Sequence, residues 1–100
     1  MQKIITLGNT TIDALRYVAN TPYGVTELNR YEMIILQIMM TQPQRVFTRE
    51  VLLQKMEHHW VELSNRVVDV RISRLRLKLR RIKSDLQIEA RRGVGYFVRF

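Results

Sequence analysis

The segment from Ser64 to about Ile82 constrains the fold most, because it contains neither glycine nor proline and is long enough for an extended helix. Some of its apolar residues alternate with polar ones, which is a strand pattern. Helical spacing explains them better, since at about 100° per residue five of them fall within an arc of roughly 80°. These five are Val68, Ile72, Leu75, Leu79 and Ile82. An uninterrupted stretch of this length is also long for a strand, so the sequence predicts a helix with one buried stripe.

The positive charge of the chain is concentrated in the same region. Residues 64–100 contain 11 lysines and arginines against 3 acidic residues, whereas residues 1–63 contain 6 of each, so the formal net charge of +8 lies in the last 37 residues. A basic segment of this kind is typical of a protein that binds a phosphate backbone. The alternative at this point is a basic face that only keeps the protein in solution.

Length and composition limit the class of protein. One hundred residues predict a single domain over 1–100. The absence of cysteine excludes a disulfide framework, a thiolate metal site and a cysteine nucleophile, and it fits a reducing, cytoplasmic environment. The longest apolar run, Met33–Met40, is too short to span a bilayer, and the N-terminus lacks the sustained apolar stretch of a signal peptide. We therefore expect no membrane association.

The first quarter of the chain predicts a small antiparallel sheet, because short β-forming segments alternate with turn signals. The segments are Ile4–Leu7, Ile12, Tyr17–Val18 and Val25–Leu28, and the turn signals are Gly8–Asn9 and Asn20–Gly24.

Two helices are predicted between this sheet and residue 64. The first begins after Asn29, which forms a capping box with Glu32, and ends at Pro43. Nearly all its sides are apolar, so we expect it to be the most buried helix. A shorter helix begins at Thr48, an N-cap residue, and extends to Met56. Residues 57–63 form a loop by elimination.

The end of the chain predicts a β-hairpin. The segments Leu86–Arg91 and Tyr96–Phe100 are β-prone, and residues 92–95 between them contain two glycines. Alternate side chains of the second segment can pack on the core. These are Tyr96, Val98 and Phe100.

The face of the long helix opposite its buried stripe has the side chains that a DNA-reading helix needs. Arginine can form a bidentate contact with guanine, and Val70 can contact a thymine methyl group. The helix N-terminus at Ser64–Asn65 presents backbone donors suited to a phosphate. Val70 and Leu77 lie among arginines, which indicates a surface that meets a partner. A helix lying on a membrane would need a larger apolar face and a bulky aromatic residue. The whole face comprises Arg66, Val67, Val70, Arg74, Leu77 and Arg81, flanked by Arg71 and Lys78 on one side and by Ser73 and Arg80 on the other.

Two motifs carry a family resemblance: SNRVVDVRISRLRLKL at Ser64–Leu79 and RGVGY at Arg92–Tyr96. The chain resembles the C-terminal effector domain of OmpR/PhoB-type response regulators. The resemblance covers the whole chain, including Glu32 in the first helix and Arg49 with Leu52–Leu53 in the second. It implies an α+β winged helix-turn-helix with an N-terminal antiparallel sheet, three helices and a C-terminal β-hairpin wing.

The resemblance also implies a function, which is sequence-specific binding of double-stranded DNA by a transcriptional regulator in a two-component system. The residues that match base-reading positions in the major groove are Val70, Arg71 and Arg74. Arg66 and Arg76 match arginines that hold phosphates, and we expect further phosphate contacts from Ser64, Ser73, Lys78 and Arg81. Arg92 matches the wing arginine, and its insertion into a narrow minor groove fits the negative potential there. Relatives bind direct repeats as pairs, so we expect two copies on each site.

The chain departs from the family pattern in four respects. A tryptophan often follows the second helix, whereas Glu57 stands there and Trp60 comes later. Family members contact RNA polymerase through that loop, so residues 57–63 are the expected polymerase contact. Ser73 stands at an often basic or polar position, and Leu77 replaces a residue that is usually charged. The phosphoacceptor receiver domain is missing, so the chain is either a fragment or a stand-alone effector domain.

No motif predicts catalysis, a cofactor or a metal. Adjacent histidines such as His58 and His59 rarely converge on one ion. Asp69, beside Arg66 and Ser73 on the helix, is better explained as an ion-pair or orienting partner than as a catalytic carboxylate. The alternatives that remain are a winged-helix protein-interaction module without DNA binding and an RNA or general nucleic-acid binder.

Overall fold

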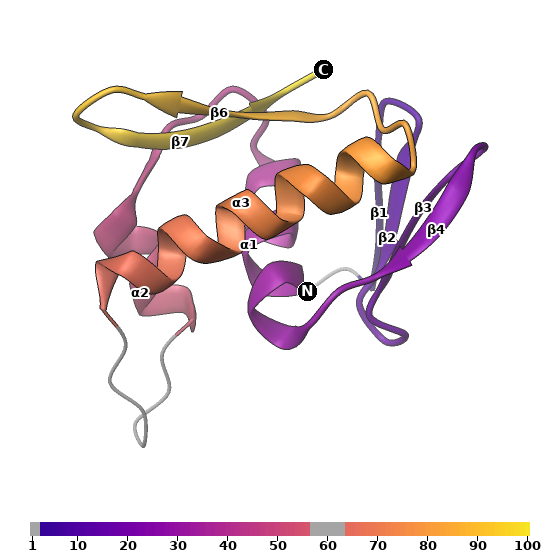
Figure 1. Cartoon of the computed structure of the whole chain (residues 1–100), viewed down its shortest axis with the longest axis horizontal. Helices are drawn as coiled ribbons and strands as arrows, with labels where there is room; N and C mark the ends of the chain where they lie inside the picture. Colours follow the sequence, from indigo (N-terminus) through magenta and orange to yellow (C-terminus); the bar gives the residue numbers. More distant parts are fainter. Residues whose placement is uncertain (1–2, 57–63) are drawn as a thin grey trace.

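The structure, a computed structural model, describes residues 3–56 and 64–100. Figure 1 shows the N-terminal sheet at one end of the molecule, the first and third helices packed beside it, the second helix at the other end, and a hairpin lying along the third helix. In chain order the elements are β1 (Ile4–Leu7), β2 (Thr10–Asp13), β3 (Val18–Thr21), β4 (Gly24–Glu27), α1 (Arg30–Thr41), β5 (Phe47–Thr48), α2 (Arg49–Met56), α3 (Asn65–Arg81), β6 (Gln87–Arg91) and β7 (Gly95–Arg99). This is the winged helix-turn-helix architecture expected from the sequence.

The N-terminal strands form an antiparallel sheet in the order β1-β2-β3-β4. The residues Ile5, Ile12 and Ala19 face each other across three strands and are buried. The sheet was predicted correctly, but two boundaries were not. Tyr17 lies in a turn with φ of 56° rather than in a strand. The turn predicted at Asn20–Gly24 is only two residues long in the structure. Asn20 and Thr21 belong to β3 and Gly24 belongs to β4, where they pair with each other's strand.

The predicted helix starts are confirmed by their capping hydrogen bonds. The Asn29 side chain accepts a hydrogen bond from the Glu32 backbone N–H, and the Glu32 carboxylate accepts one from the Asn29 backbone N–H, both at 2.9 Å. The Thr48 hydroxyl accepts one from the Val51 backbone N–H at 3.1 Å at the start of α2. Both α1 and α2 therefore begin where their capping residues predict.

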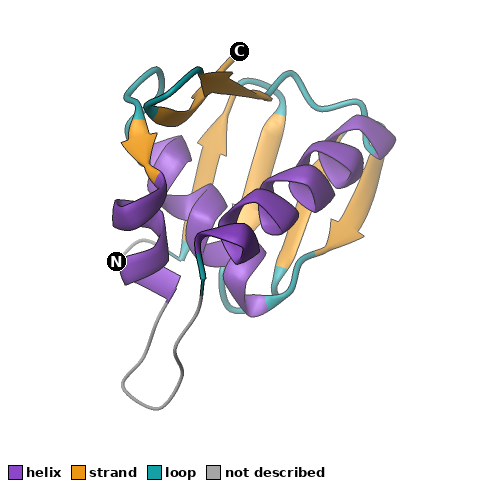
Figure 2. Ribbon diagram, turned by 60° about the vertical axis from the view of Figure 1, so that its left-hand side comes forward, coloured by secondary structure: helices purple, strands orange, loops and turns teal. Residues whose placement is uncertain are grey.

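The stripe predicted along α3 is buried at all five positions, from Val68 to Ile82. Burial of a side chain of this size stabilises the fold by about 1.5–3 kcal/mol. Figure 2 shows the helices on one face of the N-terminal sheet, with α3 running across that face. Consequently, none of the described elements covers the outer side of α3.

The turn after α3 is fastened to the β1–β2 turn. The Asp85 carboxylate accepts a hydrogen bond from the Asn9 backbone N–H at 3.0 Å, and the Asp85 backbone N–H donates to the Asn9 side chain at 2.8 Å. Asn9 Nδ2 also donates to the Lys83 carbonyl at 3.0 Å, and Thr21 Oγ1 donates to the Ile82 carbonyl. These bonds fix the C-terminal end of α3 relative to the sheet.

The C-terminal hairpin is part of a three-stranded sheet in the order β5-β7-β6. The short strand β5 was not predicted, and it pairs Phe47 with Tyr96 and Thr48 with Gly95. Tyr96 and Val98 are buried as predicted, whereas Phe100 lies beyond β7 and is exposed, so its predicted place in the core is wrong.

Within residues 3–56 and 64–100, no helix is long and apolar enough to cross a membrane. Residues 57–63, where the sequence predicts a loop that contacts polymerase, lie outside the described residues, as do His58, His59 and Trp60.

Candidate nucleic-acid interface

The outward face of α3 carries the predicted mixture of arginines and small apolar residues. Val70 and Leu77 are 43% and 44% exposed, which are large fractions for apolar side chains on a helix that also forms the core. A shallow hollow runs along this face, and it is lined by Arg66, Asp69, Val70, Ser73, Arg74 and Leu77. The buried stripe on the opposite side of α3 fixes this orientation.

Asp69 in the hollow joins three elements of the domain. Its Oδ1 accepts hydrogen bonds from Arg49 Nε of α2 at 3.0 Å and from the Tyr96 hydroxyl of β7 at 2.6 Å. The sequence predicted an ion-pair or orienting role beside Arg66 and Ser73; the ion pair instead forms with Arg49, which is 20 residues away. The pair is half-exposed, so its own stabilising effect is about 0–1 kcal/mol. Its value is to align α2, α3 and the hairpin.

Burial raises the pKa of the Tyr96 hydroxyl above its ordinary value of 10.0, and the hydrogen bond to the Asp69 carboxylate raises this pKa further, because a phenolate would face a negative charge. The hydroxyl therefore remains protonated at neutral pH and donates to Asp69. Neither Arg49 nor Tyr96 was among the predicted site residues. The signal that could have pointed to Arg49 was its place in the family resemblance.

Arg76, a predicted phosphate contact, lies against the hairpin. Its Nε donates a hydrogen bond to the Ile88 carbonyl of β6 at 2.8 Å, and its guanidinium lies 5.7 Å from the centre of the Tyr96 ring. Arginine over an aromatic ring is a favourable cation–π arrangement. In this structure Arg76 holds the hairpin to α3.

Lys78, another predicted phosphate contact, is directed inward. Its ammonium lies 2.6 Å from Oε1 of Glu32, whose side chain is 0% exposed, while the Lys78 side chain is 25% exposed. The other oxygen of Glu32 has no hydrogen-bond partner among the described residues. Lys78 thus neutralises a buried carboxylate that also caps α1, and this geometry removes it from the outward face.

The remaining predicted residues of α3 differ in exposure. Ser64, Arg66, Ser73, Arg74 and Arg81 are exposed. Ser64 is the N-cap residue but its side chain makes no capping hydrogen bond. Arg71 is half-buried, and its enclosed Nε has no hydrogen-bond partner in the part of the chain that the structure describes.

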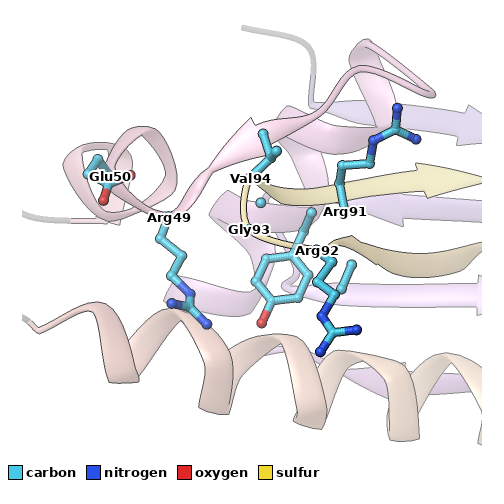
Figure 3. A pocket seen from close by; sticks show the side chains of 9 residues that line it. Arg49, Glu50, Arg91, Arg92, Gly93 and Val94 are labelled. Atoms are coloured by element: carbon cyan, nitrogen blue, oxygen red, sulfur yellow. The ribbon is translucent and has the colours of Figure 1, made fainter.

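At the hairpin tip, the consecutive residues Arg91 and Arg92 point to opposite faces of the hairpin (Figure 3). Figure 3 shows Arg92 directed toward α3, whereas Arg91 is directed to the other side of the hairpin. Gly93 has φ of 76°, which glycine adopts without strain, and the Val94 N–H donates to the Arg91 carbonyl at 2.9 Å to close the turn. A hollow between this tip and the start of α2 is lined by Arg49, Glu50 and residues 90–96.

Among the described residues, no group of three or more histidine, aspartate or glutamate side chains is placed to hold a metal ion. The chemistry of the described surface is that of exposed guanidinium groups arranged along α3 and at the hairpin tip.

Comparisons with known proteins agree with this arrangement. The family model described as "Transcriptional regulatory protein, C terminal" matches residues 23–98. The heme response regulator HssR of Staphylococcus aureus is 34% identical over 94 residues, which are 94% of this chain and 42% of that protein. The chain therefore spans less than half the length of the curated relatives it matches.

Two solved structures are similar over nearly their whole length. The DNA-binding domain of the response regulator AdeR, in complex with an intercistronic region, has a TM-score of 0.80 and 29% identity, covering 93% of this chain and 96% of that one. The RstA DNA-binding domain of Klebsiella pneumoniae, in complex with the RstA box, has a TM-score of 0.73 and 27% identity, covering 96% of both chains.

Proposed function

The chain belongs to the family of C-terminal domains of transcriptional regulatory proteins, the OmpR/PhoB-type effector domains, and from this premise we propose that it binds duplex DNA sequence-specifically. The observation that carries the proposal is the uncovered face of α3, where Val70, Arg74 and Leu77 project beside exposed arginines. The similar AdeR and RstA domains were solved with DNA. Binding, not catalysis, is the activity.

In the proposed complex α3 lies in the major groove, which is wide enough for an α-helix. Val70 and Arg74 are the central base-reading residues, because both are exposed on the line opposite the core. Arg71 remains a proposed base-reading residue at the side of this face. Its side chain is half-buried, so only the end of it reaches the DNA. Arg74 can form a bidentate contact with a guanine.

The phosphate contacts are proposed to come from residues whose side chains are not engaged within the protein. Within residues 3–56 and 64–100, this condition is met by Ser64 and Arg66 at the N-terminal end of α3 and by Arg81 at its C-terminal end, whose side chains are exposed. Arg76 and Lys78 do not meet it, because they bind the hairpin and Glu32. Phosphate contacts set the position and orientation of the helix, and base contacts supply the specificity.

Arg92 is proposed to enter the minor groove beside the one that α3 occupies. We expect Arg92→Ala to weaken binding by about 1–3 kcal/mol and to reduce the preference for an A·T-rich flank, because a narrow groove concentrates negative potential. Electrophoretic mobility shift with A·T-rich and G·C-rich flanks measures both effects. Arg91→Ala is the matched control, since Arg91 points away from α3 (Figure 3). Equal losses for the two variants would contradict the assignment.

We also propose that two copies occupy direct-repeat half-sites, as the family resemblance implies, and that the protein acts in the cytoplasm as the output of a two-component system. A contact of residues 57–63 with RNA polymerase belongs to the same proposal.

The function is tested by titrating a duplex with the protein at several salt concentrations. We expect the logarithm of the binding constant to fall linearly with the logarithm of salt concentration, by about 0.9 per neutralised phosphate. Arg66→Ala and Arg81→Ala should each lower that slope by about one. Affinity that does not depend on salt would favour a protein-interaction module, which the exposed Val70 and Leu77 could also serve. Equal competition by duplex RNA would contradict major-groove reading, because that groove in RNA is too narrow for a helix.

A further inference from the structure

Leu77 is an exposed apolar residue that the proposed contacts leave without a role. It lies seven positions after Val70 on α3. Seven residues of α-helix complete two turns to within about 20°. Both side chains therefore lie on one line, opposite the buried stripe. Leu77 and Val70 are almost equally exposed, at 44% and 43%.

The surroundings of this line indicate what covers it. The two apolar side chains line one hollow together with Arg66, Asp69, Ser73 and Arg74. The Asp69 carboxylate is paired with Arg49, and Arg81 follows on the same side of the helix. An apolar protein partner would have to bury these guanidinium groups, which costs several kcal/mol for each unpaired charge. A polyanion with apolar groups in its groove matches both features. In duplex DNA the apolar group of the major groove is the C5-methyl of thymine.

We propose that Leu77 contacts the methyl group of a second thymine, beside the one expected for Val70, and that Leu77 is a specificity-determining residue. This inference rests on the proposed function. Seven residues of α-helix span about 10.5 Å, and base pairs are spaced by about 3.4 Å along the duplex axis. Because a helix in the major groove is inclined to the duplex axis, the two thymines lie no more than about three base pairs apart, on either side of the base pair that Arg74 contacts.

Deoxyuridine tests this geometry directly, because it differs from thymidine only by the methyl group. A duplex selected from a random library by the 100-residue chain is resynthesised with one thymidine at a time replaced by deoxyuridine. Loss of a buried methyl group should weaken binding about fourfold. We expect two sensitive positions, no more than about three base pairs apart, and no such effect at other thymines.

Substitutions of Leu77 and Val70 show which of the two residues contacts each sensitive thymine. Leu77→Ala should abolish the uracil effect at one position and leave it at the other, and Val70→Ala should do the reverse. Ile4→Ala is the control, because Ile4 is also exposed and apolar, at 61%, but lies on β1 away from α3. It should retain both effects. Since Leu77 and Val70 lie outside the core, both variants should keep the thermal stability of the wild type.

The inference is overturned if the protein binds its selected duplex but no thymine is sensitive, or if Leu77→Ala keeps both sensitive positions. In those cases the proposed DNA binding still stands. If the protein selects no duplex at all, the proposed function fails first and the inference fails with it.

Discussion

Replacing Gly95 with alanine is expected to lower the free energy of unfolding by about 3 kcal/mol or more, because overpacking against rigid atoms has few ways to relax. A Cβ at this position would lie 2.0 Å from the Phe47 carbonyl oxygen and 2.9 Å from the Thr48 Cα. Both are backbone atoms, so strands β5 and β7 would have to separate. The hairpin would then lose its fixed position beside α3. Urea denaturation measures the loss, and DNA titration should show weakened binding in the same variant.

Gly93→Ala is the matched control for this prediction. Gly93 is two residues away at the hairpin tip, and apart from its own two chain neighbours none of the described residues has an atom within 4 Å of where a Cβ would lie. Its positive φ of 76° still disfavours alanine, by about 1–2 kcal/mol. Gly95→Ala should therefore be clearly the more damaging substitution. If Gly93→Ala destabilised the protein as much, the close approach of β5 to β7 would not be the reason for a glycine at 95.

The second large effect is expected from Lys78→Met. The substitution removes the partner of the buried Glu32 carboxylate, and an uncompensated buried charge costs about 3–5 kcal/mol. Because Lys78 remains a quarter exposed, water can reach the pair and we expect the lower end of this range. Unfolding in urea gives the loss of stability. The salt dependence of DNA binding should stay unchanged, since the Lys78 ammonium faces Glu32 and not the outer surface.

Two further variants separate the roles of charge and packing at this pair. Adding Glu32→Gln to Lys78→Met should recover most of the lost stability, because the amide oxygen can still accept the capping hydrogen bond from Asn29 without a buried charge. Arg81→Met, on the exposed side of the same helix, should lower the salt slope and leave stability nearly unchanged. If Lys78→Met instead lowered the salt slope of DNA binding, Lys78 would contact a DNA phosphate and this prediction would be wrong.

Features set by local sequence were predictable. The buried stripe of α3 follows from helical spacing, and the starts of α1 and α2 follow from Asn29 and Thr48, whose side chains cap the helices through hydrogen bonds within three residues. The exposure of Val70 and Leu77 follows from the same helical geometry, because they lie opposite the stripe.

Features set by distant contacts were not predictable. Lys78 and Glu32 are 46 residues apart, and only the packing of α1 on α3 brings them together. Asp69 and Tyr96 are 27 residues apart, and Arg76 is engaged by the hairpin. On an isolated helix, Arg76 and Lys78 look like further cations of a DNA-binding face. Strand β5 has only two residues, too few for any periodic pattern.

The measurement that most directly tests base reading by α3 compares Arg74→Ala with Arg81→Ala on the selected duplex and on a scrambled duplex of the same composition. We predict that Arg74→Ala loses about 1–3 kcal/mol of binding free energy on the selected duplex and much less on the scrambled one. Arg81→Ala should weaken both to the same extent, as expected for a phosphate contact. If Arg74→Ala also weakens both duplexes equally, the outward face of α3 does not read bases and the central claim is wrong.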